Sequence, residues 1–120
     1  MAVRRDSRNT RPVSWIKAAR KAFDDFPRKA QDEILRALTV AADGGFPEHM
    51  KPMKGLGSVV YEVALRHRTE AYRTVYTLEF RNALWVVHAF QKKSKSGIGT
   101  PKHEVDLITD RIKRLKEVLK

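Results

Sequence analysis

The chain has 120 residues, of which 42% are hydrophobic and 32% are charged, so its composition is that of one globular domain. It contains 25 Lys and Arg against 14 Asp and Glu, and the net charge of +11 predicts a polyanionic partner such as nucleic acid. No apolar run approaches the roughly 18–20 residues that span a bilayer, so we expect a cytoplasmic protein without a membrane partner. The absence of cysteine excludes disulfides and a cysteine nucleophile.

The first eleven residues differ from the rest of the chain. Residues 1–11 carry four Arg and almost no apolar side chain, which predicts a disordered tail. Residues 12–120 have globular composition throughout, and we expect them to form a single domain.

Two helices are predicted after a short strand over residues 12–17. The first is short and covers residues 18–25. The second begins at Pro27, and its apolar residues recur at spacings of three and four as far as Ala42. The sequence Asp-Gly-Gly at residues 43–45 is expected to end it.

Three strands with short connections are predicted in the second half of the chain. Residues 46–58 contain two Pro and two Gly and are expected to form the longest loop. Alternating apolar residues then predict strands over residues 59–66 and 72–80. Residues 84–90 are nearly all apolar, which is typical of a central strand that is buried on both faces.

A last helix completes the predicted order of elements. Thr100 is expected to cap this helix, with Pro101 in its first turn. The order strand, two helices, three-stranded meander and helix predicts an α+β fold, in which helices pack on one small antiparallel sheet.

Several kinds of site are excluded by spacing. The four His residues form no metal-ligand motif, and no paired carboxylates stand at ligand spacing, so we expect no metal and no cofactor. Residues 54–57 read Lys-Gly-Leu-Gly, which lacks the Gly-Lys-Ser/Thr ending of a phosphate loop. No Ser lies in a nucleophile-elbow pattern.

Basic residues gather at the ends of the predicted strands. The segment 43–103 contains ten Lys and Arg against five Asp and Glu. Solvated charges are common at strand ends, and this interpretation is preferred for most of these residues taken singly. Arg73 differs because it shares strand parity with Val75, so its charge is expected to emerge at a cleft. His88 lies in an apolar strand, where a hydrogen-bonded core histidine is more common than a catalytic one.

Such a basic cluster is sufficient for cleavage of RNA without a metal. A ribose 2′-hydroxyl can attack the neighbouring phosphate if a base removes its proton and cations stabilise the charge on the phosphorus centre. Arginine suits the second role because its planar fork can hold two phosphate oxygens. A lysine whose pKa is lowered by neighbouring cations can serve as base or acid.

Three sequence blocks carry a resemblance to a known family. Residues 51–57 contain Lys-Gly-Leu-Gly, residues 72–76 contain Tyr-Arg, and residues 86–94 contain His-Ala-Phe-Gln-Lys-Lys. In this order they resemble the phage-derived HigB-like toxins of the RelE/ParE superfamily, over roughly residues 12–118. The resemblance implies a RelE-like fold and the toxin of a type II toxin–antitoxin system. Such a toxin is an mRNA interferase that works on the ribosome, and a HigA-like helix-turn-helix antitoxin neutralises it.

The resemblance also implies roles for individual residues. Arg73 matches the strand arginine that stabilises the phosphorus centre, and Lys54 matches a catalytic or RNA-gripping position. Phe90 stands where several relatives carry Tyr or His, and it can stack on a base but cannot move a proton. The general base remains open among Lys54, His88 and Lys92, in that order.

The predicted site therefore has two groups of residues. The predicted catalytic residues are Lys54, Arg73, His88, Lys92 and Lys93. The predicted RNA-binding residues are Lys51, Arg66, Arg68, Tyr76, Phe90 and Lys95. We expect Arg73→Ala to lower cleavage severely while it leaves the fold intact.

Two other functions fit the same sequence. The first is a non-enzymatic inhibitor of DNA gyrase, like the ParE branch of the superfamily. The second is an inert prophage remnant. Loss of translation first after induction would support the nuclease, whereas DNA damage signalling with intact mRNA would support the gyrase inhibitor.

Overall fold

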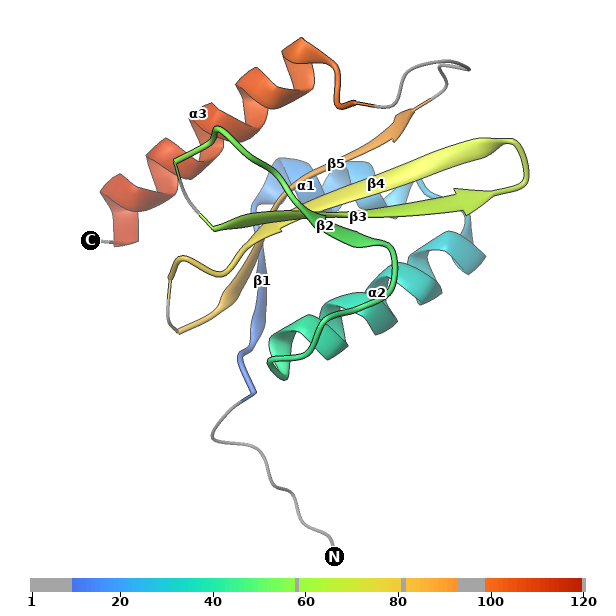
Figure 1. The fold of residues 1–120 in the computed structure, drawn as a ribbon, viewed down its shortest axis with the longest axis horizontal. Helices are drawn as coiled ribbons and strands as arrows, with labels where there is room; N and C mark the ends of the chain where they lie inside the picture. The colour runs from blue at the N-terminus through green and yellow to red at the C-terminus, as the bar shows by residue number, and fades with distance from the viewer. Residues whose placement is uncertain (1–9, 58, 81, 93–98, 120) are drawn as a thin grey trace, which may run out of the picture.

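The computed structural model describes residues 10–57, 59–80, 82–92 and 99–119. In this part of the chain, one sheet with the strand order β1-β5-β4-β3-β2 lies between helices (Figure 1). The strands are β1 (Val13–Trp15), β2 (Met50–Pro52), β3 (Val60–His67), β4 (Glu70–Thr77) and β5 (Leu84–Lys92). The helices are α1 (Lys17–Asp24), α2 (Arg28–Ala42) and α3 (Lys102–Leu119).

The predicted α+β fold and the antiparallel meander β3-β4-β5 are confirmed, but the sheet is mixed. β1 lies parallel to β5, with the Ile16 amide donating to the Val86 carbonyl and the Leu84 amide donating to the Pro12 carbonyl. β5 is buried on both faces, and β1 satisfies the edge of β5 that β4 leaves unpaired. The prediction of a purely antiparallel sheet is therefore wrong for this pair.

The predicted loop 46–58 contains a strand that the sequence did not indicate. β2 pairs antiparallel with β3, with Met50 opposite Val63 and Pro52 opposite Tyr61. It is short and ends in proline, as edge strands often do. This pairing places Lys51 directly opposite Glu62, which brings a lysine to the site described below.

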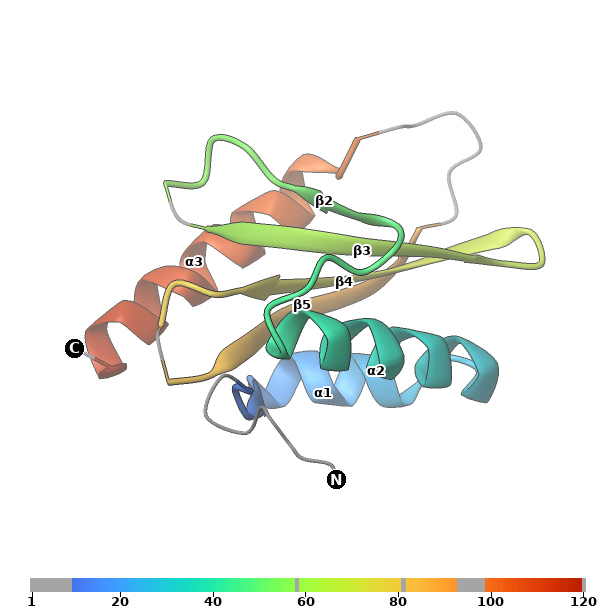
Figure 2. The same ribbon diagram turned by 60° about the horizontal axis from the view of Figure 1, so that its bottom comes forward.

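Helices cover both faces of the sheet (Figure 2). α1 and α2 pack on one face through a core that includes Phe23, Ile34 and Leu38. α3 packs on the other face, where Ile108 and Ile112 join valines of the sheet. α2 thus buries the apolar stripe that its sequence shows.

The helix ends follow the prediction in part. α2 ends as expected, with Gly44 at a φ of 94°, a conformation that glycine adopts without strain. Thr100 is not the cap of α3, because the helix begins at Lys102 and leaves Pro101 at the cap position; the Thr100 hydroxyl donates to Glu62. The Pro101 carbonyl accepts the first helical N–H groups, so Pro101 precedes the helix rather than lying within it. None of the helices in the described ranges has the length and apolar character needed to cross a bilayer.

The predicted N-terminal tail lies mostly outside the described residues. Its last two residues are attached to the end of α2. The Thr10 hydroxyl donates to Asp43 at 2.6 Å, and the Arg11 amide donates to the Ala42 carbonyl at 3.0 Å.

One irregularity interrupts the pairing of β4 with β5. Val75 lies opposite His88, whereas Tyr76 lies opposite Val86, so Val87 is the extra residue of a β-bulge. A bulge leaves its extra residue out of the ladder, which frees the Val87 carbonyl for another donor. Val87 packs in the core under α3, and His88 contacts the same helix.

Candidate active site

A block of polar side chains lies on the face of the sheet that α3 covers in part. Val75 packs in the α3 core, and Glu62 lies directly opposite it. Residues two apart on a strand share a face, so Arg73 lies on this side too. The remaining members follow from the register of β2, β3 and β5. We call this group the polar face: Lys51, Glu62, Arg66, Arg73 and Lys92.

Arg73 and Glu62 form a buried ion pair at the centre of the polar face. Arg73 is 8% exposed and Glu62 is 1% exposed, and Nη1 of Arg73 lies 3.2 Å from Oε1 of Glu62. The other carboxylate oxygen of Glu62 accepts a hydrogen bond from the Thr100 hydroxyl at 3.0 Å. Nε of Arg73 is buried and has no hydrogen-bond partner among the described residues, so the guanidinium keeps donor capacity for an anion.

Lys92 is the second buried cation of the polar face. Only 7% of the residue is exposed, and Nζ donates to the Gly99 carbonyl at 2.5 Å. Burial lowers the pKa of Lys92 from its usual value, and the neighbouring cations Arg73 and Lys51 lower this pKa further against the opposing effect of Glu62. A larger share of this lysine is therefore the neutral amine, the form that accepts a proton.

The two lysines near β2 have different positions. Lys51 acts electrostatically on Lys92 and lies opposite Glu62. Lys54 is exposed in the turn after β2, and among the described residues no hydrogen bond or ion pair joins it to Arg73 or Lys92. The structure therefore brings Lys51 rather than Lys54 to the buried cations.

This difference predicts unequal effects of two matched substitutions. Lys51→Ala removes a positive charge that lowers the pKa of Lys92, so that pKa should rise. If neutral Lys92 is the active form, the rising limb of the pH–rate profile should move to higher pH. Lys54→Ala removes a positive charge from the turn after β2 and should leave the rising limb of the pH–rate profile in place. Equal displacement by both variants would contradict this arrangement.

The predicted RNA-binding residues separate into distinct groups. Arg66 and Arg68 are exposed near the β3–β4 turn, and Arg66 lies opposite Ala71 in the row of the sheet that ends at Lys92. Phe90 is largely buried and stacks on the His88 ring, with 5.3 Å between the two ring centroids. Lys93 and Lys95 lie outside the described residues.

Tyr76 does not belong to the polar face. It is 1% exposed and packs with Tyr61 on the side of α1 and α2. Burial, with a smaller contribution from Tyr61, raises the pKa of its hydroxyl above the usual range. The prediction that Tyr76 contacts RNA is therefore wrong, because its strand parity directs it into the core.

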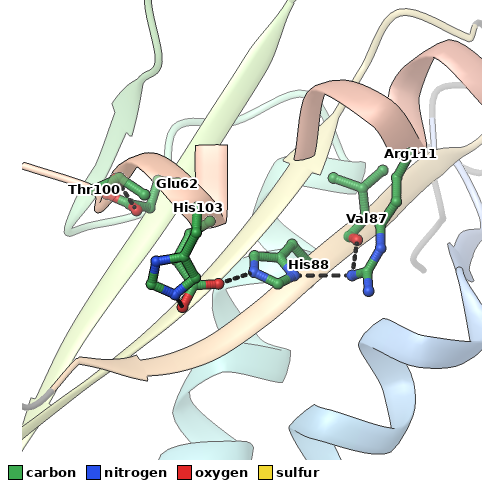
Figure 3. Close-up of polar contacts among 7 residues, drawn as sticks. Glu62, Val87, His88, Thr100, His103 and Arg111 are labelled. Atoms are coloured by element: carbon green, nitrogen blue, oxygen red, sulfur yellow. Dashed lines mark hydrogen bonds and ion pairs between the residues drawn. The ribbon is translucent and has the colours of Figure 1, made fainter. Parts of the chain in front are cut away.

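His88 has both ring nitrogens engaged by α3 (Figure 3). Nε2 lies 2.5 Å from Oε1 of Glu104, and Nδ1 lies 2.9 Å from Nη1 of Arg111. The preferred interpretation from the sequence, a hydrogen-bonded histidine near the core, is the one the structure shows. We leave His88 out of the proposed catalytic group, since neither nitrogen is free to act as a base.

Sequence reasoning missed four residues that organise this region: Glu62, Thr100, Glu104 and Arg111. A signal for Glu62 existed, because the short turn between β3 and β4 sets a register in which Glu62 and Arg73 are diagonal neighbours. The contacts made by the other three join segments far apart in sequence, and no local pattern marks them. In the described part of the chain, no group of three or more His, Asp or Glu residues could hold a metal ion.

Comparison with known proteins places the chain in a family. Residues 21–113 match the model of the family described as phage derived protein Gp49-like. The chain belongs to this family. Its fold is similar to a solved structure of E. coli toxin RelE, in a mutant form in the free state. The match has a TM-score of 0.60 and 14% identity and covers 88% of this chain and 98% of that one.

At that identity, the RelE likeness of this Gp49-like protein shows the fold alone. A search among curated proteins found no match. The family match confirms the predicted phage derivation, and the structural match confirms the predicted RelE-like fold.

Proposed function

We propose that this Gp49-like protein is the toxin of a type II toxin–antitoxin system and cleaves mRNA on the ribosome. The observation that carries the proposal is that two buried cations, Arg73 and Lys92, are neighbours on one face of the sheet. Arg73 has an unpartnered N–H, and the neighbouring Lys92 has a lowered pKa. One group can hold a phosphate while the other moves a proton.

The polar face supplies each part of the reaction. Neutral Lys92 accepts the proton of a ribose 2′-hydroxyl, and the oxygen forms a bond to the adjacent phosphorus. Arg73 donates to the non-bridging oxygens as negative charge builds on them. The bond to the 5′-oxygen breaks, and Lys51 as an ammonium protonates that oxygen. The products are a 2′,3′-cyclic phosphate and a 5′-hydroxyl.

We propose a different order of the candidates for the base from the one that the sequence suggested. Lys92 comes first because it is buried beside Arg73 and has a lowered pKa. Lys54 is exposed and has no described contact with either buried cation. Lys93 keeps the role predicted from its place after the last strand, as a further basic residue of the site.

Binding of a phosphate at Arg73 has a competitor within the chain. Glu62 occupies Nη1 of Arg73, and Thr100 holds the second oxygen of Glu62. An incoming phosphate therefore binds the remaining N–H groups of Arg73 or displaces Glu62. Exposed Arg66 and Arg68 supply the outer phosphate contacts, together with Lys95 from the sequence.

The proposed partners follow from the same surface. The net charge of +11 favours rRNA and mRNA as polyanions and makes their binding sensitive to salt. The proposed antitoxin is a HigA-like helix-turn-helix protein encoded beside the toxin.

The nucleophile can be tested by changing one atom of the substrate. An mRNA with a single 2′-deoxynucleotide at the cleavage site should remain intact on translating ribosomes, because the attacking oxygen is missing. The same substitution one codon away should leave cleavage unchanged. The cut products of native mRNA should end in 2′,3′-cyclic phosphate. Cleavage at the 2′-deoxy site, or intact mRNA with DNA damage signalling after induction, would contradict the proposal.

A further inference from the structure

His88 joins β5 to two turns of α3. Glu104 and Arg111 are seven positions apart on α3 and so lie on the same side of the helix. Glu104 contacts Nε2 of His88 and Arg111 contacts Nδ1, so the imidazole lies between them (Figure 3). The second oxygen of Glu104 lies 3.1 Å from Nε2 of exposed His103.

The contact with Arg111 fixes the protonation of His88. A guanidinium has N–H donors and no acceptor, so Nδ1 of His88 must accept through its lone pair. The ring proton then sits on Nε2, which donates to Glu104. His88 is thus a neutral bridge between a cation and an anion. Protonation of Nδ1 would place two N–H groups face to face.

The β-bulge provides a second attachment for the same arginine. Nη1 of Arg111 also donates to the Val87 carbonyl at 3.0 Å, the carbonyl that the bulge frees. His88 is 5% exposed and Glu104 is shielded beside it, so water competes little for these bonds. The bulge, the histidine and the two helix residues therefore form one connected network.

The residues just before α3 carry the contacts to the polar face. Gly99 accepts from Lys92, and Thr100 donates to Glu62. We infer that His88, Glu104 and Arg111 form a clamp that positions Gly99 and Thr100, and through them Lys92 and the Glu62–Arg73 pair. On this inference, which rests on the proposed function, His88 is a positioning residue for RNA cleavage and not a proton carrier.

The clamp has an expected pH dependence. His88 faces Glu104, Arg111 and, through Glu104, His103 on α3, and it faces the Phe90 ring on its own strand. Burial lowers the pKa of His88 below 6.5, while Glu104 opposes that shift and Arg111 supports it. The unfolded chain therefore binds this proton more readily than the folded one, so stability from the clamp is present above pH 6.5 and is lost as the pH falls further.

A pair of variants separates positioning from proton transfer. His88→Gln keeps an acceptor and an N–H donor in one planar group but cannot transfer protons near neutral pH. It should retain most of the cleavage activity. His88→Leu removes both contacts and should lower cleavage about a hundredfold through misplacement of the reacting groups. Equal loss in both variants would overturn the positioning role.

A second measurement does not depend on cleavage. Nitrogen-15 chemical shifts of His88 in the native chain should show a bare Nδ1 and a protonated Nε2 at pH 7. Amide hydrogen exchange in the first turn of α3 should accelerate in His88→Leu and stay slow in His88→Gln. An imidazolium or the other tautomer at pH 7 would overturn the clamp. If these shifts are as expected but the native chain leaves mRNA intact, the clamp stands and the proposed reaction fails.

Discussion

Arg73→Met is expected to lower the free energy of unfolding by about 3–5 kcal/mol, because it leaves the Glu62 carboxylate buried without its cation. Urea unfolding of the native chain and the variant measures this difference. The expectation from sequence alone, that Arg73→Ala leaves the fold intact, took no account of Glu62. A variant at Arg73 by itself therefore cannot separate loss of catalysis from loss of structure.

A double variant makes that separation. Arg73→Met with Glu62→Gln removes both charges of the pair, so no uncompensated charge stays buried. The double variant should unfold near the native midpoint and still lose about 10²–10³-fold in cleavage, the cost of removing a preorganised donor to the transition state.

Glu62→Gln alone is the matched control for the double variant. Its amide oxygen can accept from Arg73, and its amide nitrogen can donate to the Thr100 hydroxyl oxygen. It keeps Arg73 and should cleave RNA. If the double variant is folded and cuts mRNA as fast as Glu62→Gln does, Arg73 has no part in the reaction.

Lys92→Met should lower cleavage by about 10²–10⁴-fold, the usual contribution of a general acid or base. The side chain is replaced by one of similar length, and among the described residues the bond from Nζ to the Gly99 carbonyl is the hydrogen bond that is lost. Single-turnover cleavage on programmed ribosomes, with unfolding measured in parallel, checks the prediction.

Lys92→Arg distinguishes the two roles that a lysine could have here. Arginine keeps the positive charge but stays protonated at all accessible pH values. If Lys92 accepts a proton, Lys92→Arg should be as inactive as Lys92→Met. Near-native cleavage by Lys92→Arg would mean that Lys92 supplies charge only, and the base would have to be sought elsewhere on the polar face.

Local patterns predicted the elements of this fold well. The spacing of apolar residues located α2, and the alternation in the second half located the meander. β2 was not predicted, because a strand of three residues that ends in proline is too short to show an alternation of apolar and polar residues. The parallel pairing of β1 with β5 was not predicted, because the two strands are distant in sequence. The direction of this pairing depends on where α1 and α2 return the chain to the sheet.

Of the residues at the candidate site, only the cations could be predicted from the sequence. Strand parity placed Arg73 on a partly apolar face, and the structure shows it there. The same reasoning left Tyr76 as an RNA contact, since parity alone does not say which face α1 and α2 cover. It also placed Lys54 in the catalytic group and Lys51 among the RNA contacts, because the pairing of β2 with β3 was unknown.

The sequence by itself determined the family resemblance, the α+β class and the basic side chains from which the proposed RNA-binding site is drawn. Only the tertiary structure decided which of those charges are buried and what pairs with them. Glu62 contacts Thr100, and His88 contacts Glu104 and Arg111. These partners are too far apart in the sequence for the periodicity of a helix or strand to relate them. The physical reason is that burial and pairing set the pKa and donor capacity of a group, and both depend on atoms brought from distant segments.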